Sequence, residues 1–312
     1  MDQIINSLVL AALFALLGLS AELMVRHIKY LAKALRMKLF SFGLLLGIIT
    51  SIPEISVGIN ATVDGAPGLS VGNLLGGIMV MIGLVLGVSL ILHRKINTEG
   101  DLKIILPQLA IILLPLLLGL DGKIAQWEGI LMLLAYFSLV FYLFRVNRPG
   151  NGESLVLIEK ARLAKAVMFS LAAIVAIILI SHWIVQITLG LLEHWNVGRL
   201  TTGLLIFSLG TNLPEISIAL TAWRRRSSEL SLSHLVSSAF TNVLIFGILA
   251  AIKPMSFAVG GSYYILGISL PITLGLFLWF YLSRRRLERW EGLALLFCYL
   301  AFIGANIFII SR

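Results

Sequence analysis

Apolar residues in this chain gather in long, nearly continuous segments instead of alternating with polar residues. Each segment holds about 20 residues, the length that a helix needs to cross the hydrocarbon core of a bilayer. The segments that we expect to span a membrane are residues 4–25, 39–62, 69–92, 103–120, 124–145, 166–190, 198–222, 230–252, 261–282 and 290–310. A transmembrane β-barrel would instead show short strands of alternating polarity. The pattern therefore predicts an all-α integral membrane protein with ten transmembrane helices.

A short sequence recurs in the second and the seventh of these segments. Residues 50–56 read Thr-Ser-Ile-Pro-Glu-Ile-Ser, and residues 211–217 read Thr-Asn-Leu-Pro-Glu-Ile-Ser. Five helices per repeat is an odd number, so the second repeat enters the membrane from the opposite side, as in many secondary transporters. We expect two inverted five-helix repeats, residues 1–147 and 166–312, joined by a polar linker at 148–165.

Charge follows the predicted topology. Hydrophobic residues make up 59% of the chain and charged residues only 12%, whereas soluble domains carry about 25% charged residues. Lys and Arg concentrate in the loops after the first, third, fifth, seventh and ninth segments. The positive-inside rule then places both termini outside the cell and the 148–165 linker in the cytoplasm of a cell-membrane protein. The net charge of +9 thus reflects orientation, and we expect no nucleic-acid partner.

Glu54 and Glu215 are the candidate functional groups, because each lies in the middle of an apolar segment. A charged side chain at that depth costs about 2.5–3.5 kcal/mol on insertion scales and marks an ion or substrate pathway by default. Pro53 and Pro214 lack an N–H, so they leave nearby backbone carbonyls without helical partners. Carboxylates, carbonyls and hydroxyls are hard oxygen ligands, which suit Ca²⁺ or Na⁺ and argue against zinc or copper. The alternative is that Pro-Glu marks a helix kink and that the glutamates pair with basic groups.

The segment at 230–252 carries an unusual stripe of polar residues. His234, Ser238 and Asn242 follow one another at spacings of four, so they share one face of a helix. That face is expected to line the same cavity as the glutamates, or to form interhelical hydrogen bonds without a bound solute. A histidine titrates near neutral pH, which leaves proton coupling through His234 open.

The two repeats resemble the α-repeats of the calcium/cation antiporter superfamily, nearest to its sodium/calcium exchanger branch. Members carry G-T-S-x-P-E followed by G-N-x-x-G-S-N-x-x-(N/D) in each half. Here residues 49–54 read I-T-S-I-P-E and 72–81 read G-N-L-L-G-G-I-M-V-M, while 210–215 read G-T-N-L-P-E and 233–242 read S-H-L-V-S-S-A-F-T-N. The resemblance implies paired Ca²⁺-binding carboxylates, threonine carbonyl ligands and flanking sodium ligands. The candidate cation ligands are Glu54, Glu215, Thr50, Thr211, Ser51, Asn212, Ser238 and Asn242.

The repeats also depart from that pattern. Met81 stands where the family has Asn or Asp, Gly77 stands where it has Ser, and Asn212 replaces the second motif serine. A thioether is a poor ligand for Na⁺ or Ca²⁺, so at least one sodium position is expected to be weakened. The stoichiometry of exchange is left open.

We expect an antiporter that exchanges Ca²⁺, or a related cation, for Na⁺ by alternating access, without a resident cofactor. Its partners would be inorganic cations and the lipid bilayer; its oligomeric state is left open, and a monomer is compatible with the sequence. Two alternatives within transport are a proton/cation exchanger that uses the same glutamates and a passive cation channel. An intramembrane hydrolase is disfavoured, because no convincing nucleophile–base pair, aspartate pair or metal motif is present, and the protein is not expected to be an enzyme.

Overall fold

The computed structural model describes residues 2–34, 47–93, 95–98, 101–146, 160–195, 197–224, 228–283 and 286–311, and these are mostly helical. In the N-terminal half the main elements are α1 (Asp2–Ala34), α3 (Ile52–Val63), α4 (Pro67–Met79), the π-helical η1 (Val80–Val85), α5 (Leu86–His93), α6 (Leu102–Ile112), α7 (Leu114–Leu118) and α8 (Gln126–Val146). In the C-terminal half they are α9 (Lys160–Trp195), α10 (Arg199–Thr202), the π-helical η3 (Gly203–Phe207), α11 (Ser208–Thr211), α12 (Leu213–Arg224), α13 (Ser228–Ile252), α14 (Gly261–Ser283) and α15 (Arg289–Ile310).

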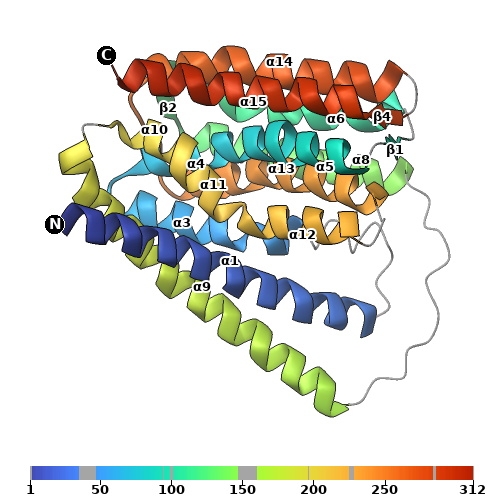
Figure 1. Cartoon of the computed structure of the whole chain (residues 1–312), viewed down its shortest axis with the longest axis horizontal. Helices are drawn as coiled ribbons and strands as arrows, with labels where there is room; N and C mark the ends of the chain where they lie inside the picture. The colour runs from blue at the N-terminus through green and yellow to red at the C-terminus, as the bar shows by residue number, and fades with distance from the viewer. Residues whose placement is uncertain are drawn as a thin grey trace.

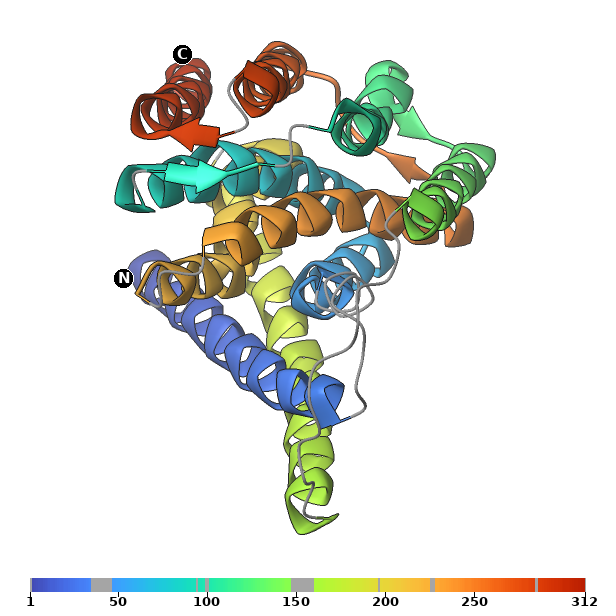
Figure 2. The same ribbon diagram turned by 90° about the vertical axis from the view of Figure 1, so that its right-hand side faces the viewer.

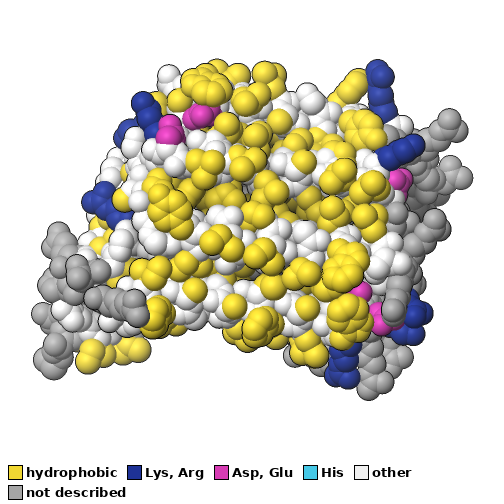
Figure 3. Space-filling model, turned by 90° about the horizontal axis from the view of Figure 1, so that it is seen from above, with side chains coloured by type: hydrophobic (Ala, Val, Ile, Leu, Met, Phe, Trp, Pro, Cys, Tyr) yellow, Lys and Arg dark blue, Asp and Glu magenta, His cyan; other side chains and the backbone are white. Residues whose placement is uncertain are grey.

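Eight of the described helices are long and apolar enough to cross a membrane. The expected segments that do not meet this criterion are 39–62, of which residues 39–46 lie outside the described part, and 198–222, which is divided among α10, η3, α11 and α12. The count of ten crossings therefore stays a prediction. On the face seen in Figure 3, hydrophobic side chains cover the middle of the molecule, and charged side chains gather toward its two ends.

The helices form layers whose central members are buried on all sides. In Figures 1 and 2, α14 and α15 lie on one side, α4, α5 and α13 lie in the middle, and α1 and α9 lie on the opposite side. Every residue of α4 from Gly68 to Met79 is buried, as expected for a helix that is apolar around its whole circumference. The site motifs therefore lie next to the interior of the bundle.

A glycine pair brings the two halves into direct backbone contact in this interior. A Cβ atom added at Gly72 of α4 would lie 2.9 Å from the Cα atom of Gly203 in η3, and a Cβ atom at Gly203 would lie equally close to the Cα atom of Gly72. Small residues at such crossings let helix backbones approach closely in membranes. The crossing fixes α4 against the segment that leads into the second motif.

Helices α1 and α9 pack against each other and form a hydrophobic cluster together with residues of α3, α4 and η3. The cluster includes Leu17 and Met24 of α1 and Ile177 and Ile184 of α9, and it reaches the rest of the protein partly through Phe207 of η3. In Figure 2 the two helices extend away from the remaining helices. The pair is thus anchored to the bundle through α3 and η3.

Several boundaries differ from the expectation. Helix α9 begins at Lys160, so residues 160–165 are helical although the linker was expected to reach residue 165. The segment expected at 103–120 divides into α6 and α7 around Leu113, next to Pro115, which stands in the first turn of α7, where its missing N–H costs no helical hydrogen bond. Four short strands were not expected: β1 (Lys95–Asn97) pairs with β4 (Arg286–Glu288), and β2 (Lys123–Ile124) pairs with β3 (Met255–Ser256).

Candidate functional site

Both copies of the repeated motif lie where a helix is interrupted. Residues 47–50 are helical, Ser51 is a turn residue, and α3 begins at Ile52. In the second copy α11 ends at Thr211, Asn212 is a turn residue, and α12 begins at Leu213. Pro53 and Pro214 stand at the second position of α3 and α12, where their missing N–H costs no helical hydrogen bond. The break leaves each glutamate in the first turn of the new helix.

Glu54 and Glu215 are both buried, with 1% of each residue exposed. Their carboxylates lie near enough to each other for electrostatic repulsion. Among the described residues, neither oxygen of Glu54 has a hydrogen-bond partner, and Oε2 of Glu215 has none. A buried carboxylate without partners is costly, so the two groups require a compensating partner that the described contacts do not supply.

The hydroxyl groups of the two motifs cross over between the halves. The Thr211 side chain lies near Glu54, and the Thr50 side chain lies near Glu215. Thr50 Oγ1 lies 3.3 Å from Ser238 Oγ of α13, and Thr211 Oγ1 donates a hydrogen bond of 2.9 Å to Asn73 Oδ1 of α4. Each carboxylate is thereby flanked by a polar side chain from the opposite half.

Two asparagines point amide oxygens without protein partners into the buried interior. Asn212 Nδ2 donates to the carbonyl oxygen of Ser208 at 2.8 Å, and Asn242 Nδ2 donates to the carbonyl oxygen of Leu74 at 2.9 Å. Because a carbonyl cannot donate, these bonds fix which end of each amide is nitrogen. The Oδ1 atoms of both residues are buried and lack hydrogen-bond partners in the described part of the chain.

All eight predicted ligand residues are buried, and the contacts join five of them, namely Glu54, Glu215, Thr50, Thr211 and Ser238. Asn212 and Asn242 bond to the backbone carbonyls given above, and Ser51 donates a hydrogen bond of 2.8 Å to the Gly47 carbonyl in the helical turn before it. Asn73 was not among the predicted ligands, although its bond to Thr211 places it beside the site. Its position within the Gly-Asn pair of the first repeat was the signal that could have identified it. Met81 is buried in the apolar core.

The glutamate pair differs from the other buried carboxylates. Glu128 Oε2 accepts a hydrogen bond of 2.7 Å from the Ala125 N–H, and Glu291 Oε2 accepts one of 2.7 Å from the Glu288 N–H. Those two groups cap helix N-termini, where a carboxylate is favourable. No group of three or more His, Cys, Asp and Glu side chains gathers anywhere in the described ranges. The site therefore offers two charged ligands and several neutral oxygens.

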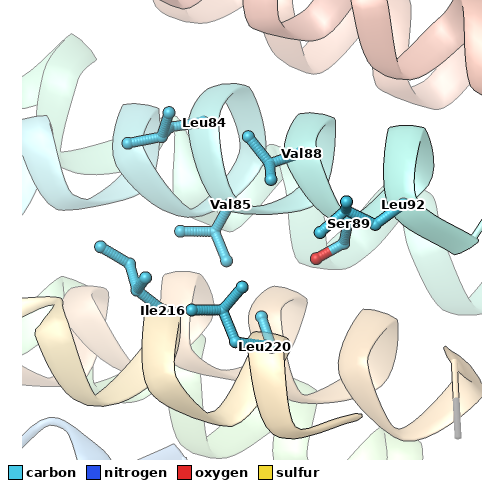
Figure 4. Close-up of a pocket in the computed structure, with 8 residues that line it drawn as sticks. Leu84, Val85, Val88, Ser89, Leu92, Ile216 and Leu220 are labelled. Atoms are coloured by element: carbon cyan, nitrogen blue, oxygen red, sulfur yellow. The ribbon is translucent and has the colours of Figure 1, made fainter. Parts of the chain in front are cut away.

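A separate pocket lies between η1–α5 and α12 and is apolar. In Figure 4, Val85 of the upper helix faces Ile216 and Leu220 of the lower one, and Ser89 is the polar residue in its lining. Ile216 follows Glu215 directly in the chain, but neither glutamate lines this pocket. The pocket thus lacks the oxygen ligands that a cation would require.

The fold and the site define a helical membrane protein with a buried acidic centre. The profile of the family described as "Sodium/calcium exchanger protein" matches residues 5–145 and 165–308. The chain belongs to this family, and it is therefore a membrane cation antiporter and not an enzyme.

Named relatives and solved structures resemble the chain over nearly its whole length. It is 24% identical to "Sodium/calcium exchanger MaX1" of Methanosarcina acetivorans, over 96% of this chain and 97% of the relative, and 27% identical to "Putative antiporter CaxA" of Alkalimonas amylolytica, over 97% and 100%. A structure of the sodium-calcium exchanger NCX_Mj superposes with a TM-score of 0.68 at 21% identity, covering 96% of this chain and 98% of that one. The crystal structure of the H⁺/Ca²⁺ exchanger CAX gives 0.74 at 15% identity, covering 99% and 85%. These similarities agree with the fold.

Proposed function

We propose that the protein exchanges Ca²⁺, or a related divalent cation, for Na⁺ across the cell membrane by alternating access at a site between Glu54 and Glu215. One observation carries the proposal: the two copies of the motif bring two buried carboxylates together, and three of their four oxygens lack hydrogen-bond partners among the described residues. Hard oxygen ligands of this kind suit Ca²⁺ and Na⁺. The relative named a sodium/calcium exchanger supports the same pair of ions.

The exclusive use of one site would enforce exchange. An empty site leaves two nearby carboxylates uncompensated in a low-dielectric interior, which disfavours a closed, unloaded state. The site must therefore bind one kind of ion or the other before the protein switches between its outward-facing and inward-facing states. A Ca²⁺ ion and the counter-ions would compete for Glu54, Glu215 and the neutral oxygens of Thr50, Thr211, Ser238, Asn212 and Asn242.

Alternating access in this proposal follows from two inverted repeats of five helices, residues 1–147 and 166–312. Two observations support it: the helix breaks at Ser51 and Asn212 occupy the same place in both motif copies, and the two chain ends lie at the same end of the molecule in Figure 1. We assign that end to the outside and the 148–165 linker to the cytoplasm. Helices α1 and α9, which pack against each other, would move together across the site.

The test measures uptake of labelled Ca²⁺ into proteoliposomes loaded in turn with Na⁺, with K⁺ or with acidic buffer. Na⁺-loaded vesicles are expected to take up Ca²⁺, and the Glu54→Gln and Glu215→Gln variants are expected to lose that uptake. Glu128→Gln is the matched control, because it changes a buried carboxylate that caps a helix instead of facing the other half. Undiminished uptake by both site variants would show that the site is assigned to the wrong residues.

Proton/cation exchange is the second candidate. His234 of α13 is buried and lies one turn before Ser238, whose hydroxyl contacts Thr50. Ca²⁺ uptake that follows a pH gradient in the absence of Na⁺ and K⁺ gradients, and that falls in a His234→Gln variant, would favour proton coupling over sodium coupling.

A further inference from the structure

A second pair of matching motifs shows how the two halves of the chain correspond around the apolar pocket. Residues 127–129 and 290–292 both read Trp-Glu-Gly and lie in the first turns of α8 and α15. A Cβ atom added at Gly87 of α5 would lie 3.0 Å from the carbonyl oxygen of the glycine in the second copy, and one added at Gly247 of α13 would lie 3.0 Å from that of the glycine in the first copy. The two crossings are therefore equivalent, and Gly87 corresponds to Gly247, 160 positions later.

The helices that face α5 and α13 correspond at a slightly different offset. Helices α3 and α12 follow the two copies of the Pro-Glu motif, which lie 161 positions apart. The offset between α5 and α13 is one residue shorter, because the π-helical η1 adds a residue before α5, whereas α13 is α-helical throughout. By these offsets Ser89 of α5 corresponds to Leu249 of α13, and Ala219 of α12 corresponds to Gly58 of α3.

The pocket lies where the two halves differ in side-chain length. Leu249 Cδ1 would lie 2.9 Å from a Cβ atom added at Gly58, so this leucine reaches the backbone of α3. Ser89 and Ala219 line the pocket at the equivalent place in the other half. The serine side chain is shorter than leucine, and a cavity of about 140 Å³ lies between α5 and α12 (Figure 4).

The pocket opens toward the surface that faces lipid. Its buried lining includes Val85 and Ala219. Its rim is formed by apolar side chains that are partly or largely exposed, namely Leu84, Val88, Leu92 and Leu220. Helix α5 ends a segment, Pro67–Leu92, that is long and apolar enough to cross a membrane, so hydrocarbon tails surround this rim. Ser89, the polar residue of the lining, already has an interaction partner. An apolar cavity of about 150 Å³ stays dry and binds apolar molecules.

We propose that this pocket binds an acyl chain of a membrane phospholipid, which enters past the rim and lies between α5 and α12. The chain contacts both halves of the protein, because α5 belongs to the first repeat and α12 to the second. It packs beside Ile216, the residue that follows Glu215 in α12. Leu249 supplies the equivalent hydrocarbon from the protein itself in the other half.

The experiment uses full-length protein in bilayers that contain a phosphatidylcholine with a diazirine group on one acyl chain. After irradiation, mass spectrometry of peptides locates the labelled residues. The surrounding lipid labels exposed Leu220 whether or not the pocket is used, so the readout is labelling of buried Val85 and Ala219. We expect both to be labelled in the natural protein. Ser89→Leu should lose this labelling and retain that of Leu220.

Two further variants make the test independent of Ser89→Leu alone. Ala219→Leu fills the pocket from the other helix and should remove the labelling of Val85. Leu249→Ser is the reciprocal change, and it should create labelling at Ile245, the buried counterpart of Val85. Size exclusion and the midpoint of thermal unfolding identify the variants that are folded and can be compared.

Three results would overturn the inference. They are absence of labelling at Val85 and Ala219 in the natural protein, unchanged labelling in the folded variants with a filled pocket, and labelling by a diazirine fatty acid but not by the phospholipid. A folded Leu249→Ser protein without labelling at Ile245 would refute the role given to residue length at this position. Each of these results would leave the proposed exchange at Glu54 and Glu215 unaffected, because the pocket is a separate site.

Discussion

Replacing Gly72 with alanine should destabilise the protein more than the same replacement at a helical glycine that has free space around it. The new Cβ atom would overlap the Leu200 carbonyl oxygen and lie 2.8 Å from the Leu204 nitrogen and 2.9 Å from the Gly203 Cα atom. All three are backbone atoms, so no side-chain rotation relieves the contact. Either α4 must move away from η3, or the two helices must accept the strain.

The size of the effect follows from this geometry. Overpacking a buried site costs typically 1–3 kcal/mol, and occasionally more, and contacts with backbone alone favour the upper end of that range. At an unfolding entropy of about 2.1 cal/mol/K per residue, a chain of 312 residues loses about 4–5 °C in its midpoint of thermal unfolding for a loss of about 3 kcal/mol. Because Asn73 follows Gly72 directly, any shift of α4 also disturbs the bond from Thr211 to Asn73, and Ca²⁺ uptake should fall.

Thermal unfolding in detergent, followed by intrinsic fluorescence or by size exclusion after heating, measures the change. Gly275→Ala in α14 is the matched control, because a Cβ atom there meets no atom within 4 Å. It should leave the midpoint unchanged or raise it slightly, since alanine is favoured over glycine in a helix by about 0.5–1 kcal/mol. Equal midpoints for Gly72→Ala and the natural protein would contradict the close crossing of α4 and η3.

Two further predictions concern the site. Thr211→Val removes the hydroxyl that donates to Asn73 Oδ1 and lies beside Glu54. The loss of about 0.5–1.5 kcal/mol should weaken Ca²⁺ affinity by about 2- to 12-fold, while Thr211→Ser should retain the affinity of the natural protein. Equal affinities for all three proteins would remove Thr211 from the site. Free Ca²⁺ at about 100 times its Kd should stabilise the natural protein by about 2.7 kcal/mol, and the Glu54→Gln/Glu215→Gln variant should show no such shift of its thermal midpoint. An identical shift in that variant would place the Ca²⁺ site elsewhere.

The helical regions were predictable because membrane spans have a strong signal in sequence. Long apolar segments must satisfy their backbone hydrogen bonds internally, so the positions of α1, α8, α13, α14 and α15 follow closely from residue type. Pro53 and Pro214 indicated the helix breaks for an equally local reason, the missing N–H. Helix ends near polar residues were less certain: α9 begins at Lys160 because a helix can extend beyond the apolar region into the solvent.

The short strands could not be predicted in the same way. Strands β1 and β4, for example, have three residues each and pair with partners about 190 positions away in the sequence, so no local periodicity reveals them. Each strand has one buried apolar residue, Ile96 or Leu287, which is too few to set a period, and the pairing exists because the helices on either side bring the two segments together.

The sequence by itself determined that this protein is a helical membrane protein with two related motifs and that Glu54 and Glu215 are costly residues that require a role. Only the tertiary structure decided which groups surround them: Thr50 lies near Glu215, Thr211 lies near Glu54, and two asparagine amides fill the space beside Gly77. Local residue chemistry determines where a segment is apolar and where a helix is interrupted. The neighbours of a carboxylate are set instead by how helices distant in the sequence cross, and in this protein a contact between Gly72 and Gly203 fixes that crossing.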